Sequence, residues 1–553
     1  MSPGHEGPVV RTVAHAVGDA LARGGVRTVF GVMGSGNFLV TNAMVAGGAR
    51  YIAARHEGGA ATMADAHARM SGEVTALSVH QGCGFTNALT GITEAAKSRT
   101  PLVVVTAEAT SPRSNFFVDQ PALAAAVGAV SMRVTSPADA VAQATAAVAT
   151  ARDERRVVVL NLPLDVQGLA ATAVELPPPS ARPSVAPDAA EVARLVDALR
   201  RAERPVFVAG RGARGPGSRA ALEELADRCG ALLATSAVAK GLFRGNAWDL
   251  DVSGGFATPL AAELIGGADL IVGWGCALNM WTMRHGRLIA DDAVVVQVDL
   301  ESDAIGAQRD VTFGVVGDVR AVADAAAADL AGERTGYRSP VVRRAIAERG
   351  RWRDEPFDEV GETGFIDPRT LTIALDDLLP AERVVAVDSG NFMGYPSMFL
   401  DVPDEHGFCF TQAFQSVGLG LATAIGAAVA RPDRLPVAGL GDGGALMAAS
   451  ELETVVRLGL PMVVVVYDDA AYGAEVHHFG PDGHPLDTVR FPETDVAAIA
   501  RGYGFEALTV REVADLDGLA TWLAGPRTAP LLIDAKVTRG EPSWWLEEAF
   551  RGH

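Results

Sequence analysis

Short apolar runs alternate with longer amphipathic stretches along the whole chain. The runs are rich in Val and end in Gly or Pro, which is typical of parallel strands buried on both faces. Alternation of such strands with helices predicts an α/β fold with parallel sheets. The clearest runs lie at 101–109, 155–163, 204–210, 268–275, 293–300, 383–390, 435–443 and 461–469.

Two segments interrupt this alternation and are predicted to be linkers. Residues 175–188 are rich in Pro, and residues 332–368 are polar and broken by Pro and Gly. They divide the chain into three blocks of similar size, at 1–178, 188–332 and 360–553. We expect each block to be a doubly wound parallel-sheet domain.

Composition narrows the range of partners. The 553 residues carry a formal net charge of −20, which argues against nucleic acid or an anionic membrane surface as the main partner. We find no signal-peptide pattern at the N-terminus and no apolar run long enough to span a membrane. The four cysteines form no CxxC pair, so neither a zinc site nor a disulfide framework is indicated, and a cytoplasmic location is expected.

The strongest chemical signal lies at 441–473. Asp442 follows one apolar strand and Asp469 follows the next. The carboxyl ends of parallel strands share one edge, so the two carboxylates are expected to face one site. Gly441 and Gly443 let backbone N–H groups approach an anion. This pattern predicts an Mg²⁺–diphosphate site, although an ordinary βαβ unit with acidic turns would also explain it.

Two further residues carry weaker signals. Glu57 lies near the start of an Ala-rich helix, and His80 lies at the end of an apolar strand. Taken alone, a helix-end carboxylate and a core histidine explain them as well as a catalytic pair does. Their functional interpretation is proton transfer.

Segment 441–473 resembles the cofactor motif of the thiamine-diphosphate-dependent acetolactate synthase and pyruvate decarboxylase superfamily. In that motif GDG is followed by Asn-Asn, and here 24 residues separate Gly443 from Asp468. The resemblance implies that Mg²⁺ is bound by the side chains of Asp442 and Asp469 and by the main-chain carbonyl of Ala471. Asp468-Asp469 replaces the usual Asn-Asn, which adds negative charge and is expected to tighten the need for the divalent ion.

Other segments are similar to the same family. Residues 54–69 resemble the segment whose Glu activates the cofactor, which assigns that role to Glu57. Benzoylformate decarboxylase has a histidine in a place similar to His80, and pyruvate decarboxylases keep a catalytic Glu at the position of Glu475. Gly58 departs from the Gln usual in acetolactate synthases. The cofactor-binding residues implied by the resemblance are Gly390, Asn391, Val417, Gly441, Gly443, Gly444, Tyr472 and Gly473.

A dinucleotide fingerprint also occurs in the middle block. Residues 205–215 read as a strand followed by GxGxxG, but the fingerprint needs an acid at the end of the next strand. That strand ends in Thr235 and Ser236. Residues 275–286 also lack the stretch typical of FAD-binding acetolactate synthases, so FAD is not expected.

The resemblance covers nearly the whole chain and implies an enzyme that needs thiamine diphosphate and Mg²⁺. We expect an acyloin-forming, decarboxylating carboligase that takes a 2-oxo acid and an aldehyde or keto-acid acceptor. Because the pyrimidine domain of one subunit meets the diphosphate domain of another in this family, a homodimer or homotetramer is implied. Three alternatives stay open: a non-ligating decarboxylase, a non-catalytic cofactor-binding homologue, and an NAD-dependent enzyme using 205–215.

Overall fold

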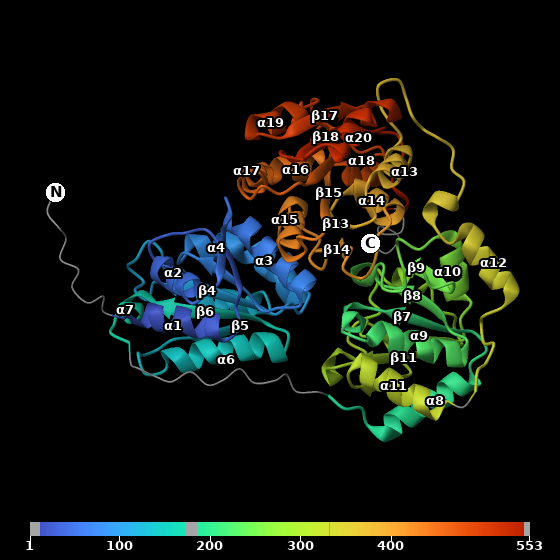
Figure 1. Ribbon diagram of the computed structural model, residues 1–553, viewed down its shortest axis with the longest axis horizontal. Helices are drawn as coiled ribbons and strands as arrows, with labels where there is room; N and C mark the ends of the chain where they lie inside the picture. The colour runs from blue at the N-terminus through green and yellow to red at the C-terminus, as the bar shows by residue number, and fades with distance from the viewer. Residues whose placement is uncertain (1–10, 172–184, 331, 547–553) are drawn as a thin grey trace.

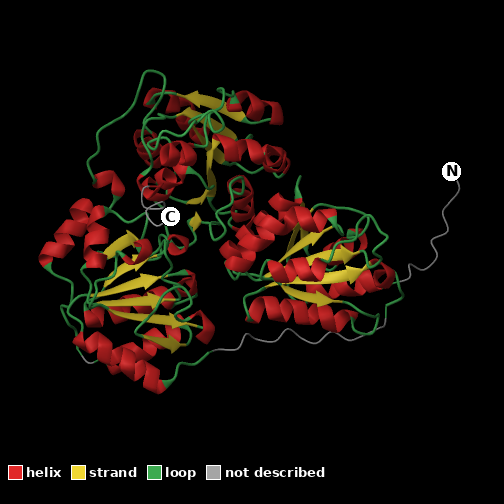
Figure 2. Cartoon of the chain, turned by 180° about the vertical axis from the view of Figure 1, so that it is seen from behind, coloured by secondary structure: helices red, strands yellow, loops and turns green. Residues whose placement is uncertain are grey.

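The computed structural model describes residues 11–171, 185–330 and 332–546. These ranges form three α/β domains, each built on a six-stranded parallel sheet with helices packed on both faces (Figure 1). The predicted fold class is therefore confirmed. Figure 2 shows the three sheets in separate lobes, each flanked by its own helices. The exact domain boundaries stay a prediction.

The N-terminal domain has the strand order β2-β1-β3-β4-β6-β5. Its central strands are buried throughout because both sheet faces are covered by helices. The strands are β1 (Thr28–Gly31), β2 (Arg50–Ala53), β3 (Thr75–Val79), β4 (Leu102–Glu108), β5 (Val130–Arg133) and β6 (Val157–Pro163), and the helices are α1 (Val13–Arg23), α2 (Phe38–Ala46), α3 (Glu57–Ser71), α4 (Cys83–Lys97), α5 (Gln120–Ala126), α6 (Ala140–Asp153) and α7 (Leu164–Gln167).

The middle domain has the order β12-β11-β10-β7-β8-β9, which is the Rossmann arrangement. The strands are β7 (Pro205–Ala209), β8 (Leu232–Thr235), β9 (Asp249–Val252), β10 (Leu270–Trp274), β11 (Val294–Asp299) and β12 (Phe313–Val316). The helices are α8 (Ala189–Arg201), α9 (Ser218–Cys229), α10 (Pro259–Gly266) and α11 (Val319–Asp329), with short 3-10 turns η1 (Arg211–Arg214), η2 (Ala237–Ala239), η3 (Arg284–Gly286) and η4 (Ser302–Ala304).

The C-terminal domain has the order β14-β13-β15-β16-β18-β17. The strands are β13 (Arg383–Val387), β14 (Phe408–Cys409), β15 (Leu435–Gly441), β16 (Val463–Asp468), β17 (Glu506–Val510) and β18 (Leu531–Lys536). The helices are α13 (Pro368–Leu378), α14 (Gly394–Phe399), α15 (Gly420–Ala430), α16 (Asp442–Met447), α17 (Leu452–Arg457), α18 (Gly473–Phe479), α19 (Val496–Tyr503) and α20 (Asp517–Ala524), with 3-10 turns η6 (Asn391–Met393), η7 (Ala449–Glu451) and η8 (Val513–Leu516).

The second predicted linker is partly helical. Helix α12 (Pro340–Arg349) begins after Ser339, whose hydroxyl accepts a hydrogen bond from the Val342 N–H at 3.2 Å. Val342 and Ile346 pack against the core of the middle domain, and a 3-10 turn η5 (Trp352–Asp354) follows. The helix is mostly exposed and polar, so its apolar pattern is too weak to detect in the sequence. Most of the first predicted linker lies outside the described residues.

Helix α3 of the N-terminal domain packs against α15 of the C-terminal domain, and their apolar side chains join one core cluster. A buried ion cluster borders this contact. Arg69 bonds Asp65 at 2.6 Å and Glu94 at 2.8 Å, and it also donates to the Phe410 carbonyl. Glu94 accepts the main-chain N–H of Ala413 at 3.0 Å. The N-terminal domain therefore holds the loop that leads to Val417.

Candidate functional site

The two predicted metal ligands lie at the ends of neighbouring strands. Asp442 follows β15 and Asp469 follows β16, and Gly441 pairs with Tyr467 across these strands. Burial and the nearby Asp468 carboxylate raise the pKa of Asp442 to about 7. Burial and the Asp442 carboxylate raise the pKa of Asp469 to about 8. Two coupled oxygen ligands in a buried, negative environment suit a divalent cation.

The third predicted ligand, the Ala471 carbonyl, belongs to the turn after β16. Asp468 accepts the Ala470 N–H at 2.9 Å, and Asp469 accepts the Ala471 N–H at 3.1 Å. Ala470 has a φ of 51°, a left-handed conformation that non-glycine residues seldom adopt. The two side chains thus hold a strained turn beside the carboxylate pair.

Asp468, which replaces the usual Asn, has a cationic partner. Asp468 forms a buried ion pair with Lys536 at the end of the neighbouring strand β18. Lys536 also bonds Asp534 at 3.0 Å and the Thr494 carbonyl at 3.0 Å. Lys536 lies 68 positions away along the chain, so nothing in the 441–473 motif indicated this partner.

Glycines lie next to the carboxylate pair and let side chains approach the backbone closely. A Cβ at Gly444 would collide with the Asp388 carboxylate, and one at Gly473 would collide with Asp469. A Cβ at Gly443 would lie 3.0 Å from the Tyr472 ring. The missing side chains therefore bring Asp388, Asp469 and Tyr472 close to the backbone beside the carboxylate pair.

Asp388 positions the Val417 loop, a role that the sequence did not reveal. It lies at the end of β13, fully buried, and accepts the N–H groups of Gly418 at 3.0 Å and Leu419 at 3.2 Å. Burial raises the pKa of Asp388 to about 6. Val417 itself is 42% exposed, and a Cβ at Gly444 would lie 3.5 Å from its side chain.

Gly390 and Asn391 lie in the loop between β13 and α14. Gly390 has a φ of 144°, which only glycine adopts readily. Asn391 begins the turn η6, and its side chain borders Gly473. Asn391 and Asp469 therefore lie beside the same glycine, Gly473.

The structure brings Glu57 and His80 to one glycine of the N-terminal domain. A Cβ at Gly84 would lie 3.0 Å from the His80 Cβ and 3.4 Å from Glu57 Oε1. Asn87 donates to Glu57 Oε2 at 3.1 Å. His80 Nδ1 lies 3.0 Å from the Gln81 carbonyl, and its ring meets Phe116 edge-on. A half-buried carboxylate beside an imidazole can move protons.

Glu475 belongs to the C-terminal domain, whereas Glu57 and His80 belong to the N-terminal domain. It is exposed on the short helix α18, next to the turn that contains Ala471. Within the described residues, no hydrogen bond or ion pair joins Glu475 to Glu57 or His80. Burial lowers the pKa of His477 on the same helix.

No direct bond joins the N-terminal and C-terminal halves of the predicted site within the described residues of one chain. Glu451, before α17, accepts the N–H groups of Arg55 and His56, each at 3.0 Å. Glu57, the first residue of α3, comes directly after His56. The start of α3 is therefore bonded to the C-terminal domain. No hydrogen bond or ion pair in the described parts of the chain joins Glu57 to Asp442 or Asp469.

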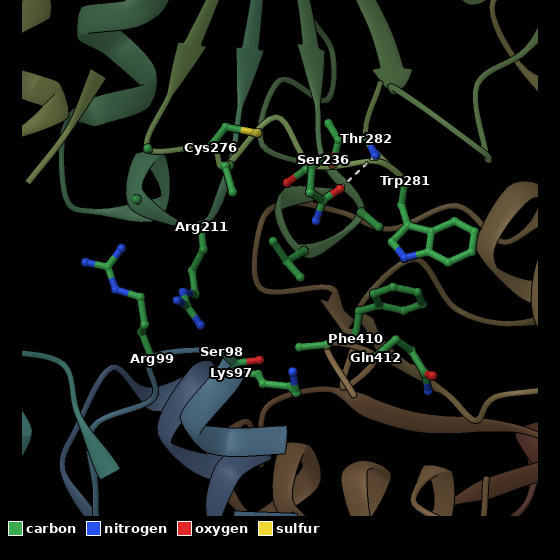
Figure 3. A pocket seen from close by; sticks show the side chains of 18 of the residues that line it. Lys97, Ser98, Arg99, Arg211, Ser236, Cys276, Trp281, Thr282, Phe410 and Gln412 are labelled. Carbon is green, nitrogen blue, oxygen red and sulfur yellow. Dashed lines mark hydrogen bonds between the residues drawn. The ribbon is translucent and has the colours of Figure 1, made fainter. Parts of the chain in front are cut away.

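A second cavity of about 290 Å³ lies where the three domains meet. Figure 3 shows Arg99 and Arg211 at one end and Trp281 and Phe410 at the other. Burial and the positive charges of nearby arginines lower the pKa of Arg211 to about 9. The guanidinium of Arg211 has no hydrogen bond or ion pair with the described residues, so this end suits an anionic group.

The dinucleotide fingerprint does not form a helix N-terminus. Gly210 follows β7, but the next four residues form the 3-10 turn η1, and α9 begins only at Ser218. Among the described residues, no group of three or more His, Cys, Asp or Glu side chains is arranged to hold a metal ion. The site predicted above needs only two carboxylates and a carbonyl. No described helix is long and apolar enough to cross a membrane.

Three family models match the chain in order. They describe the N-terminal TPP binding domain (residues 11–123), the central domain (192–326) and the C-terminal TPP binding domain (388–535) of thiamine pyrophosphate enzymes. Together they span most of the chain. The protein belongs to the thiamine-diphosphate-dependent enzymes, whose members form or cleave carbon–carbon bonds.

Similar proteins carry different activities. An acetolactate synthase large subunit from Parasynechococcus marenigrum is 29% identical, over 96% of this chain and 88% of that protein. A sulfoacetaldehyde acetyltransferase from Castellaniella defragrans is 29% identical, over 91% and 89%. A probable 2-ketoarginine decarboxylase from Pseudomonas aeruginosa is 28% identical, over 92% and 90%.

Proposed function

We propose that this enzyme is a Mg²⁺-dependent, decarboxylating carboligase that joins a 2-oxo acid to an aldehyde or keto-acid acceptor. The observation that carries the proposal is the pair Asp442 and Asp469, which follow the neighbouring parallel strands β15 and β16 beside a group of glycines. When bound there, thiamine diphosphate supplies a nucleophilic carbon and accepts the electrons released as CO₂ leaves.

The residues of the chain then have separate tasks. Asp442, Asp469 and the Ala471 carbonyl hold the metal ion, and Gly441, Gly443 and Gly444 with Gly473 admit the diphosphate. Val417 supports the cofactor from the apolar side. Tyr472, whose ring borders Gly443, closes the pocket. Glu57 holds a proton at the pyrimidine ring, which makes the cofactor reactive, and His80 donates or accepts a proton at the substrate oxygen.

The two half-sites are proposed to meet between subunits. No hydrogen bond or ion pair joins Glu57 to Asp442 in the described residues of one chain, and large apolar side chains are exposed near both halves. Such exposure around a half-site favours association. A homodimer, or a homotetramer built from such dimers, would complete two sites. Near the halves, Phe38, Phe116, Phe117, Leu446, Met447 and Phe479 are all at least 40% exposed.

Two relatives, named acetolactate synthase and sulfoacetaldehyde acetyltransferase, support ligation or acyl transfer. A second candidate is a non-ligating decarboxylase. It is favoured by His80, which lies beside Glu57 and can supply the proton that a simple decarboxylation needs. In that case Glu475, on the helix after the metal turn, is the second candidate proton donor.

The test is product analysis by mass spectrometry. The purified protein would be incubated with thiamine diphosphate, Mg²⁺ and a panel of 2-oxo acids, with and without acceptors. An acyloin or acetohydroxy acid supports the carboligase, whereas aldehyde alone supports the decarboxylase. Removal of divalent ions with EDTA should abolish either activity. Cofactor binding without turnover of any donor would instead support a non-catalytic homologue.

The proposed cofactor set does not include FAD, because residues 275–286 lack the expected stretch and η1 separates the glycines from α9. Bound FAD in the purified protein, detected by its absorbance, would overturn this. A cytoplasmic location is supported by four free cysteines, three of them buried.

A further inference from the structure

The C-terminal segment Ser543–Leu546 contacts the predicted cofactor loop directly. The Ser543 N–H donates to the Asn391 side-chain oxygen at 3.0 Å. The Trp545 indole N–H donates to the Asn391 carbonyl at 2.9 Å. One residue of the loop is therefore held at both its side chain and its main chain by residues about 150 positions away.

These bonds fix the orientation of the Asn391 amide. Its oxygen faces Ser543, so its NH₂ group is turned the other way. A Cβ at Gly473 would lie 3.4 Å from that nitrogen, and the same Cβ would collide with Asp469. The NH₂ group therefore lies beside the metal turn, where an anionic oxygen needs donors.

The fold makes room for this contact. Gly394, the first residue of α14, has helical angles of φ −61° and ψ −42°, so alanine would suit its backbone. Its missing side chain is what matters, because a Cβ there would collide with Ser543 Oγ and Trp545 Cδ1. Leu546 is only 3% exposed, which anchors the segment.

The neighbouring Trp544 provides an internal contrast. Its ring packs on Trp352 with 6.2 Å between centroids and lies under the Arg284 guanidinium at 5.6 Å. Its indole N–H is buried and has no hydrogen-bond partner among the described residues. Trp544 therefore only packs, whereas Trp545 also donates a hydrogen bond to the cofactor loop.

We propose that Ser543 and Trp545 are positioning residues of the cofactor site: they orient Asn391 so that its NH₂ group is ready to donate to the diphosphate. This inference rests on the proposed function, because it assumes that the diphosphate binds beside Asp469. In this proposal the C-terminal segment, which belongs to none of the three sheets, holds the cofactor loop in position.

The test compares Trp545→Phe with its matched control Trp544→Phe. Both changes remove one indole N–H, but only the first breaks a hydrogen bond. The dissociation constant of thiamine diphosphate with Mg²⁺ would be measured by calorimetry, with melting of the cofactor-free protein as the control for folding. We expect Trp545→Phe to weaken binding about fivefold, the effect of one hydrogen bond, with an unchanged melting temperature. Trp544→Phe should stay within about twofold of the wild type.

A second variant disturbs the same contact through a change in α14 instead of the C-terminal segment. Gly394→Ala displaces Ser543 and Trp545 but leaves Asn391 and both tryptophans in the chain, and we expect it to weaken binding at least as much as Trp545→Phe. Equal affinity of wild type and Trp545→Phe, or equal losses in the two tryptophan variants, would overturn the positioning role while leaving the proposed function intact. A wild-type protein that binds no thiamine diphosphate would overturn both.

Discussion

The N-terminal and C-terminal domains have the same sheet topology but different chemistry at the corresponding edge. In both sheets the strand order is second, first, third, fourth, sixth, fifth. The order reverses between β1 and β3 in one domain and between β13 and β15 in the other. Such a reversal opens a crevice at the carboxyl ends of the strands. Both half-sites lie at these crevices.

The difference between the crevices is their charge. The N-terminal crevice has one half-buried carboxylate, Glu57, with His80. The C-terminal crevice gathers Asp388, Asp442, Asp468 and Asp469 against a single lysine, Lys536. The shared topology thus supplies two similar crevices, and the side chains after each strand decide which one suits a metal ion and which one suits proton transfer.

The largest expected effect comes from removing a metal ligand. Asp442→Ala should weaken binding of Mg²⁺ and thiamine diphosphate at least about a hundredfold, because an oxygen ligand is lost. Calorimetry measures this directly. The control is Asp165→Ala, an exposed carboxylate at the carboxyl edge of the N-terminal sheet. If Asp165→Ala weakened binding equally, the assignment of the metal site to the C-terminal crevice would be wrong.

Glu57→Gln should distinguish proton transfer in the N-terminal crevice from cofactor binding in the C-terminal crevice. We expect turnover to fall about a hundredfold or more, the usual contribution of a proton-transferring group, while cofactor affinity changes little. Steady-state rates and calorimetry on the same protein check both parts. Glu73→Gln, an exposed glutamate just after the same helix, should be indistinguishable from the wild type. A protein whose activity is untouched by Glu57→Gln does not use this crevice for proton transfer.

The third prediction concerns stability at the C-terminal crevice. Lys536→Met leaves Asp468 buried without its partner and should lower the free energy of unfolding by about 3–5 kcal/mol. Adding Asp468→Asn should restore part of that loss, because one of the two buried carboxylates that Lys536 pairs with is then neutral and only Asp534 remains without its partner. Urea unfolding of the single and double variants measures both, with the exposed Lys97→Met as the control. Failure of the double variant to recover would show that packing, not charge, holds this turn.

The smallest effect is a pH dependence set by Asp388. Burial raises the pKa of Asp388 from 3.8 to about 6, so the folded protein keeps a proton there that the unfolded chain releases. This contribution is fully present below about pH 4 and is lost as the pH rises through about 6, a change of about 3 kcal/mol. Urea unfolding of the cofactor-free protein between pH 4 and 7 tests it. Asp388→Asn should reduce this slope and leave the part that Asp442 and Asp469 contribute through their own raised pKa values, whereas Asp165→Asn should not change it; identical slopes in all three proteins would contradict the assignment.

Much of the fold and of the C-terminal crevice could be predicted from the local pattern of apolar and polar residues. Buried parallel strands are continuous apolar runs, and the residue after each run lies at the sheet edge, so Asp442 and Asp469 were predictable together. The helix α12 was not, because an exposed ten-residue helix leaves a weak pattern. Asp388 lay within a recognised segment, yet its bonds to Gly418 and Leu419 depend on how two loops meet.

By itself, the sequence determined the α/β class, the order of the three domains and the pairing of acidic residues at one edge, since these follow from periodicity and from the residues that end each strand. Only the tertiary structure decided what surrounds them: Lys536 beside Asp468, Glu451 at the start of α3, and Ser543 and Trp545 on Asn391. These contacts join positions far apart in the chain. They are fixed by the packing of separate elements, which leaves no spacing in the sequence to detect.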